Sequence, residues 1–273
     1  MLYFYGLGLG LRALMRGRLT RETIKNILVP VNYWRIKEYE LVFNELQPTA
    51  QDCILDIGSP KLLSLFIADK YESDVISTDI NGYFIEEYNF LRGMRNIPDS
   101  RFQTMTMDGR KMNLPENSCT KVFSISVLEH IPDDGDSACV KEIARVLRKG
   151  GECYITVPFS PESAVEYKDE RDFYWSAASK KKEERTTSTF FQRRYSEQDL
   201  YKRLIEPSGL KIKKVEFVGE KVFTTSDREL SRYLKPFTGP VQPLLAHLFL
   251  TKPASAYKDL SKPLAAFIVL QKQ

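Results

Sequence analysis

From residue 52 onward, short runs of β-branched and aromatic residues alternate with segments whose apolar residues recur every three or four positions. The first pattern is typical of strands, and the second is typical of amphipathic helices. Strands that alternate with helices form a parallel sheet covered on both faces. The pattern predicts seven strands, over residues 53–57, 74–79, 101–106, 121–127, 152–157, 210–218 and 264–270.

Helices are expected in the segments between these strands. They are predicted over residues 61–70, 82–92, 136–148 and 196–205. The glycine pair at 150–151 is expected to end the third helix. The elements together predict one α/β domain over residues 51–273. Its fold is a Rossmann-like, doubly wound, seven-stranded sheet that is mostly parallel with an antiparallel terminal strand.

Residues 1–50 lie outside this alternation and are predicted to form a helical cap. Residues 1–15 are mostly apolar, and three arginines follow within the next six positions. The run contains Arg12 and three glycines and is too short for a membrane span, which needs about 20 apolar residues. A signal peptide carries its positive charges before the apolar run. Contact of the cap with substrate, or peripheral contact with a membrane, remains open.

In two segments of the domain the apolar residues show no helical or strand periodicity. Residues 159–195 are polar and aromatic, and a connection of this length in a compact domain is usually a lid or a binding segment. Residues 219–263 form a proline-rich insertion with an apolar run at 244–250. We expect the cap, this lid loop and this insertion to select the substrate.

Composition narrows the classes of protein. The 273 residues include 40 Lys and Arg against 36 Asp and Glu, so the net charge of +4 is too small to indicate a nucleic-acid partner. The four cysteines are widely spaced and there are only two histidines, so no metal site is expected. Cysteine usage indicates a reducing compartment, and we expect a cytoplasmic protein. The sequence gives no indication of the oligomeric state.

Candidate ligand-binding residues follow the predicted strands. Ligands of open α/β sheets bind at the carboxyl ends of the strands. Asp56, Gly58 and Ser59 follow the first strand there, Asp79 ends the second, and Asp108 follows the third. A glycine lets a ligand approach the backbone, and a carboxylate at the end of the second strand accepts hydrogen bonds from ribose hydroxyls. The alternatives are structural: a turn cap for Asp56, a surface carboxylate for Asp79, and a turn for Asp108.

The order of these residues, with two later runs, resembles class I S-adenosylmethionine-dependent methyltransferases, in particular the type 11 group. The resemblance rests on Ile54–Gly58, Asp79, Asp108, the run SVLEHI at 126–131 and the run ARVLRKGG at 144–151. It covers about residues 50–220 and the last strand. The family usually has two further glycines where this chain has Pro60 and Leu62. A nicotinamide-dinucleotide site requires the motif GxGxxG after the first strand. This chain has one glycine there, which disfavours a nicotinamide cofactor.

The resemblance implies S-adenosylmethionine as the cofactor. Asp56 and Gly58 would line its methionine and ribose parts, and Asp79 would hold the ribose hydroxyls. The full set of expected cofactor-binding residues is Asp56, Gly58, Ser59, Asp79, Ile80, Asp108, Gly109 and Ser126.

The function predicted on this basis is methyl transfer to an oxygen or nitrogen atom of a small molecule, of glycan or secondary-metabolite type. His130 is the candidate general base, with Glu129 beside it, because an imidazole titrates near neutral pH. A local hydrogen bond of His130 is the structural alternative. The residues expected to contact substrate are Tyr33, Trp34, Tyr174, Trp175, Arg194 and Tyr195. The missing glycines leave a second function open, that of a non-catalytic binding or partner subunit.

Overall fold

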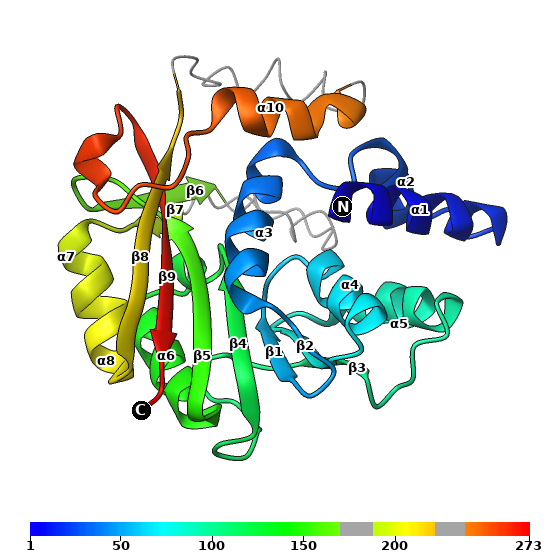
Figure 1. Ribbon diagram of the computed structural model, residues 1–273, viewed down its shortest axis with the longest axis horizontal. Helices are drawn as coiled ribbons and strands as arrows, with labels where there is room; N and C mark the ends of the chain where they lie inside the picture. The colour runs from blue at the N-terminus through cyan, green and yellow to red at the C-terminus, as the bar shows by residue number, and fades with distance from the viewer. Residues whose placement is uncertain (170–187, 222–237) are drawn as a thin grey trace.

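A seven-stranded sheet forms the centre of the molecule (Figure 1). The computed structural model describes residues 1–169, 188–221 and 238–273. The strand order is β3-β2-β1-β4-β5-β9-β8, and β9 runs antiparallel to both of its neighbours while the pairs from β3 to β5 are parallel. The strands are β1 (Cys53–Ile57), β2 (Asp74–Asp79), β3 (Phe102–Thr106), β4 (Cys119–Ile125), β5 (Leu147–Pro158), β8 (Lys211–Gly219) and β9 (Pro263–Gln271).

The central strands are buried on both faces because successive side chains point to opposite sides of the sheet. In β1, Leu55 and Ile57 belong to one apolar core and Ile54 belongs to the other. The prediction of a doubly wound, mostly parallel sheet with an antiparallel terminal strand is therefore confirmed.

Helices cover both faces of the sheet. One layer contains α3, α4 and α5, and the other contains α6 and the helical segment that precedes β8 (Figure 1). The main helices are α1 (Leu2–Met15), α2 (Arg21–Leu28), α3 (Tyr33–Leu46), α4 (Leu62–Lys70), α5 (Ile85–Met94), α6 (Gly135–Val146) and α10 (Gln242–Phe249). The shorter helical segments are η1 (Gly82–Phe84), η2 (Leu128–His130), α7 (Glu197–Asp199), η5 (Leu200–Ile205), α8 (Glu206–Ser208), η7 (Gly239–Val241) and η8 (Tyr257–Asp259).

The first 50 residues form three helices, α1, α2 and α3. Helix α1 packs against α2 at Gly10, where a Cβ atom would lie 2.9 Å from the backbone nitrogen of Ile27. Helix α3 begins after Asn32, whose side chain accepts a hydrogen bond from the Arg35 amide at 2.9 Å. It then crosses the sheet over β4 and β5. None of the helices in the described parts of the chain has the length and apolarity that crossing a bilayer requires.

Several expected boundaries differ from the structure. The helix predicted to reach residue 148 ends at Val146, and β5 already begins at Leu147. Gly150 therefore lies inside a strand rather than after a helix. Its φ of +77° bends that strand, and its amide still donates to the Lys272 carbonyl. Helix α4 begins at Leu62, so Pro60 lies in the preceding loop and not in the first helical turn.

The lid loop contains two strands that its polar sequence did not predict. Strands β6 (Ala164–Asp169) and β7 (Ser188–Arg194) pair as an antiparallel hairpin. The helix predicted after it begins at Ser196, whose side chain accepts from the Asp199 amide as the capping pattern predicts. It then widens to a π-helical turn over Leu200–Ile205.

Candidate active site

The loop after β1 approaches the end of β4 at Gly58. Gly58 has a φ of +62°, and a Cβ atom there would lie 2.7 Å from Cγ1 of Val127. Both facts require glycine at this position. The neighbouring Ser59 is buried, and its hydroxyl accepts a hydrogen bond from the Ile125 amide at 2.8 Å. The carboxyl ends of β1 and β4 are therefore fixed to one another.

Asp56 is the anchor of this loop. Its side chain has no exposed surface. Its carboxylate accepts from the Ser59 amide at 3.1 Å, from the hydroxyls of Ser64 and Ser77 at 2.5 and 2.8 Å, and it lies 3.4 Å from the ammonium of Lys61. With four partners inside the protein, Asp56 holds the loop in place instead of facing a ligand directly.

Lys61 occupies the space beneath the loop. Its ammonium is buried, donates to the Thr78 carbonyl at 2.5 Å and lies 4.8 Å from the centre of the Phe84 ring. A buried ammonium with an anionic partner, a carbonyl and an aromatic face is fully compensated. This cluster stands where the resemblance would place the flexible glycines, and it stiffens the loop from below.

Asp79 ends β2 with its carboxylate near the surface. One oxygen accepts from the Asn81 amide at 3.0 Å, and burial raises the pKa of the carboxyl above its ordinary value. The side chains of Ile80 and Tyr83 beside it are exposed. A partly buried carboxylate flanked by exposed apolar side chains suits a nucleoside, which presents two hydroxyls and a planar base.

Asp108 and Gly109 follow β3. The guanidinium of Arg110 binds both carboxylate oxygens of Asp108 at 2.7–3.1 Å and lowers the pKa of that carboxyl. At Gly109 a Cβ atom would lie 2.9 Å from Sγ of Cys139, so the backbone packs closely on α6. The expected role of these two residues in cofactor binding stays a prediction.

The end of β4 is strained and polar. Ser126 has a φ of +51°, a conformation that costs a non-glycine residue of order 1 kcal/mol or more and that clusters at functional sites. Its hydroxyl donates to the Glu38 carboxylate of α3, which also accepts from the Thr156 hydroxyl at 2.9 Å and from Arg35 at 2.6 Å. Helix α3 is thus tied to the ends of β4 and β5 through one buried carboxylate.

Glu129 lies beside this cluster with part of its carboxyl unengaged. The side chain is buried, and its Oε2 atom has no hydrogen-bond partner among the described residues. Burial raises the pKa of Glu129 to about 8, and the negative charge of Glu38 adds to that rise. The carboxyl of Glu129 is therefore largely protonated at neutral pH.

His130 is oriented by the hairpin above it. Its Nδ1 atom lies 2.7 Å from the Phe191 carbonyl, and because a carbonyl only accepts, Nδ1 carries the hydrogen. Burial lowers the pKa of His130, so the ring is neutral near pH 7 and Nε2 keeps its lone pair. Nε2 lies 3.8 Å from Oε1 of Glu129. The arrangement provides a proton acceptor next to a buried carboxyl.

The hairpin is clamped over this centre. Arg193 in β7 donates to the carbonyls of Ile131 and Asp133 at 3.1 and 2.7 Å, so β7 is held against the segment that carries His130. Arg194, a predicted substrate residue, pairs with Glu166 across the hairpin at 2.6 Å.

The other predicted lid residues lie elsewhere. Tyr195 has no exposed surface, and its hydroxyl donates to buried Asp136 at 2.8 Å. It belongs to the apolar core that also contains Phe159 and Leu200, so it does not face a substrate. Tyr174 and Trp175 lie outside the described residues.

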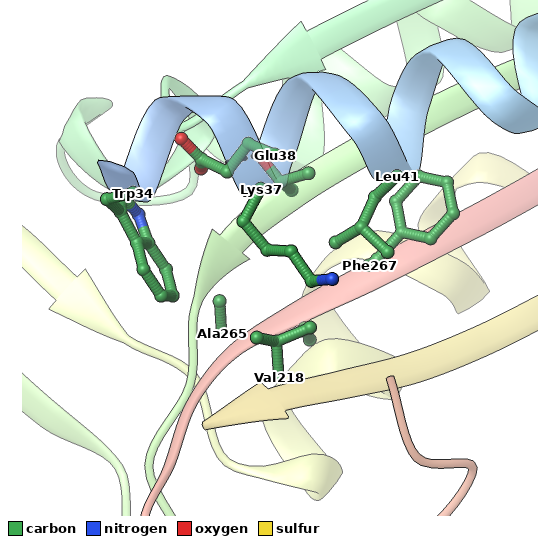
Figure 2. A pocket seen from close by; sticks show the side chains of 9 residues that line it. Trp34, Lys37, Glu38, Leu41, Val218, Ala265 and Phe267 are labelled. Carbon is green, nitrogen blue, oxygen red and sulfur yellow. Dashed lines mark hydrogen bonds between the residues drawn. The ribbon is translucent and has the colours of Figure 1, made fainter. Parts of the chain in front are cut away.

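Trp34 lines a small cavity between α3 and the strands β5, β8 and β9 (Figure 2). The cavity has a volume of about 10 Å³, room for about one water molecule, and its lining is apolar. Tyr33 lies at the start of the same helix, where its amide donates to Gln242 of α10 at 2.7 Å. A second hollow of about 520 Å³ opens at the opposite edge of the sheet, and none of the predicted site residues lines it.

Three residues of this centre were not predicted as site residues: Arg35, Glu38 and Phe191. For Arg35 and Glu38 the sequence of α3 contains one indication. Glu38 lies on the same side of the helix as buried Val42 and Leu46. A charge on an apolar stripe indicates a buried partner. For Phe191 the sequence holds no such signal, because it is the backbone carbonyl that binds His130.

Comparison with known proteins agrees with this geometry. A family model described as a methyltransferase domain matches residues 55–155, from β1 to β5. No curated protein matches the chain significantly. Among solved structures, the [4+2]-cyclase SpnF shares 15% sequence identity and a TM-score of 0.56, covering 88% of this chain and 82% of its own.

Two further structures carry methyltransferase names. An S-adenosylmethionine-dependent methyltransferase from Methanosarcina mazei is 17% identical, with a TM-score of 0.52 and coverage of 86% of this chain and 97% of its own. The 1,6-didemethyltoxoflavin-N1-methyltransferase of Burkholderia thailandensis, solved with its substrate and S-adenosylhomocysteine, is 10% identical, with a TM-score of 0.53 and coverage of 87% and 77%. At these identities the structures show a shared fold.

The sheet order and the matched segment show that the chain has the Rossmann-like fold of S-adenosylmethionine-dependent methyltransferases. The similarity to the methyltransferase domain covers residues 55–155.

Proposed function

We propose that this enzyme transfers the methyl group of S-adenosylmethionine to an oxygen or nitrogen atom of a small molecule, of glycan or secondary-metabolite type, in the cytoplasm. The observation that carries the proposal is the arrangement at the end of β4. There the neutral imidazole of His130 keeps a lone pair on Nε2 beside the buried carboxyl of Glu129. The loop of Gly58 lies against the same segment through Val127.

The residues present fit the cofactor. Gly58 lets the first loop pack against Val127 at the end of β4, and Asp79 offers carboxylate oxygens for the ribose hydroxyls. Ile80 would lie against the adenine, and Ser126 would lie near the methionine moiety. When bound, the cofactor supplies an electrophilic methyl group on a sulfonium.

The protein's own contribution is positioning and proton transfer. The bond from Nδ1 of His130 to the Phe191 carbonyl fixes the ring, so that Nε2 can accept the proton of an acceptor hydroxyl or protonated amine. The protonated carboxyl of Glu129 can donate one hydrogen bond to the acceptor and so orient it. Helix α3 contacts the centre through Glu38, and the β6–β7 hairpin contacts it through the Phe191 carbonyl.

A structural neighbour supports a small acceptor. The cavity beside Trp34 has room for about one water molecule, far below the roughly 300–1,000 Å³ of ordinary ligand pockets, so the acceptor would bind outside it. The Burkholderia enzyme of the same fold binds the small molecule 1,6-didemethyltoxoflavin, which agrees with a small-molecule acceptor.

Calorimetric titration with S-adenosylmethionine and S-adenosylhomocysteine tests cofactor binding. Asp79→Asn should weaken binding by about 1–3 kcal/mol, because the ribose loses a charge-assisted hydrogen bond. Asp74→Asn changes the exposed carboxylate at the other end of β2 and should leave affinity unchanged. Wild-type protein that binds neither ligand at millimolar concentration would overturn the proposal. Equal affinity for wild type and Asp79→Asn would remove Asp79 from the site.

A panel of hydroxyl and amine acceptors then tests the reaction. The expected result is a methylated product in one of the two acceptor classes, with the cofactor consumed in equal amount. Binding of the cofactor without any product across both classes would favour the alternative of a non-catalytic binding subunit.

A further inference from the structure

The outward face of helix α1 is apolar. The helix packs on the protein through Tyr3, Leu9 and Ala13, and its opposite side exposes other large apolar side chains. These exposed residues are Met1, Phe4, Leu11, Leu14 and Met15. Phe4, Leu11 and Met15 recur at helical spacing, so they form one continuous stripe along the helix. Phe4 and Met15 are more than 70% exposed, which is unusual for such side chains.

Two neighbouring helices extend this apolar surface. On α2 the side chains of Ile24 and Leu28 are exposed one turn apart. On α10 and the turn before it, Val241, Leu244 and Leu248 are exposed at helical spacing. The segments touch, since a Cβ atom at Gly239 would overlap the carbonyl of Leu28 and approach the hydroxyl of Tyr3. Figure 1 shows α1, α2 and α10 along the same end of the molecule.

Positive charge is concentrated on the same helices. Residues 1–28 contain five basic residues and one acidic residue, a net charge of +4. The whole chain has 40 basic and 36 acidic residues, also +4, so the remainder is balanced. Arg18 is paired with Glu86 and Glu87. Arg12, Arg16 and Arg21 are exposed and form no ion pair within the described parts of the chain.

We infer that the apolar face of α1, α2 and α10, bordered by Arg12, Arg16 and Arg21, docks on a lipid bilayer that contains anionic headgroups. Exposed apolar side chains gain free energy by entering the interfacial layer, and arginines beside them are attracted to the negative surface. The surface lies on the bilayer without crossing it, in keeping with the short helices of the cap.

This surface borders the active site. Helix α10 packs on α3, and α3 carries the Arg35–Glu38 pair that is joined to the end of β4. Docking would therefore place the reactive centre close to the membrane. The inference about docking does not depend on the proposed reaction, because it rests on the outer side of these helices.

Flotation of the whole protein with vesicles tests the inference. We expect wild type to bind vesicles of phosphatidylcholine containing about one third phosphatidylglycerol, and to bind pure phosphatidylcholine at least about tenfold more weakly. The triple variant Phe4→Ser, Leu11→Ser, Met15→Ser should lose binding to the anionic vesicles. The double variant Arg12→Gln, Arg16→Gln should bind the anionic vesicles about tenfold or more weakly than wild type. Added salt should likewise weaken the binding of wild type to these vesicles.

Matched controls use exposed residues on the distant α7–β8 side. Tyr201→Ser with Ile212→Ser, and Lys202→Gln with Lys211→Gln, should bind vesicles as wild type does. Absence of vesicle binding by the wild type, or equal binding by the α1 variants, would overturn the inference. A dimer in solution that the triple variant dissociates, without vesicle binding, would also overturn it and would assign the face to a second copy of the chain. Unchanged binding of the cofactor by each variant confirms its fold.

Discussion

The ends of β1 and β4 lie side by side, yet their polar side chains differ in how fully their hydrogen bonds are satisfied. After β1, the carboxylate of Asp56 is saturated by four donors, and the ammonium of Lys61 is buried against it. After β4, Ser126 is strained, the Glu129 carboxyl has an oxygen without a partner, and Nε2 of His130 keeps its lone pair. A saturated network is rigid, and an unsatisfied one is available for a ligand. We therefore regard the β1 loop as the support and the β4 end as the reactive part.

The largest effect is expected from breaking the support. Asp56→Asn leaves the buried ammonium of Lys61 without its anion, which should lower the free energy of unfolding by about 3–5 kcal/mol. Urea denaturation measures this change. The double variant Asp56→Asn, Lys61→Met should recover part of the loss, because it removes both charges.

A surface pair provides the contrast for that prediction. Asp99, paired with Arg92, is largely exposed, and Asp99→Asn should change the unfolding free energy by about 1 kcal/mol at most. If Asp56→Asn were as mild as Asp99→Asn, the β1 loop would not be held by its buried pair.

Substitution of His130 should change activity and not stability. His130→Asn removes the proton acceptor, so kcat should fall by about 10²- to 10⁴-fold. Cofactor affinity and the midpoint of unfolding should stay close to wild type, because His130 forms one hydrogen bond to the hairpin. Full turnover of His130→Asn with the acceptor found in the panel would end its role as the base.

Substitution of Glu129 should give the smallest effect, and this effect should depend on pH. Its pKa of about 8 lies above the ordinary value of 4.5, so the unfolded chain releases a proton that the folded protein keeps. The contribution of Glu129 to stability is therefore lost progressively as pH rises from about 4.5 to about 8. Glu129→Gln should be more stable than wild type by about 3 kcal/mol at pH 7, with no difference near pH 4. Denaturant titrations at both pH values measure this. Equal stability at pH 7 would show that the carboxyl is not desolvated.

The sequence predicted the sheet well because its central strands are apolar runs that are buried on both sides. The boundaries of β1 and β2 agree at every residue, and the final strand differs by one residue at each end. The hairpin in the lid loop was missed because β6 and β7 are short, polar and paired only to each other. Their stability comes from the side chain of Arg193 and from contacts far along the chain.

The site was predicted in part, and the reason is physical. Asp79, Ser126, Glu129 and His130 follow strands, so their position at the carboxyl edge can be inferred from order alone. Burial cannot be inferred in this way. Asp56 and Tyr195 turned inward, and Glu38 joined the centre from a helix 88 residues before Ser126.

The central claim is that His130 presents a neutral ring with its lone pair on Nε2. Since the chain has only two histidines, nuclear magnetic resonance of labelled imidazoles tests it directly, with a His247→Gln variant to assign the signals. The account predicts the Nδ1-protonated tautomer, a pKa below the ordinary 6.5, and a change in the His130 signals when S-adenosylhomocysteine is added. An Nε2-protonated ring, a pKa above 6.5, or signals indifferent to the nucleoside would contradict it.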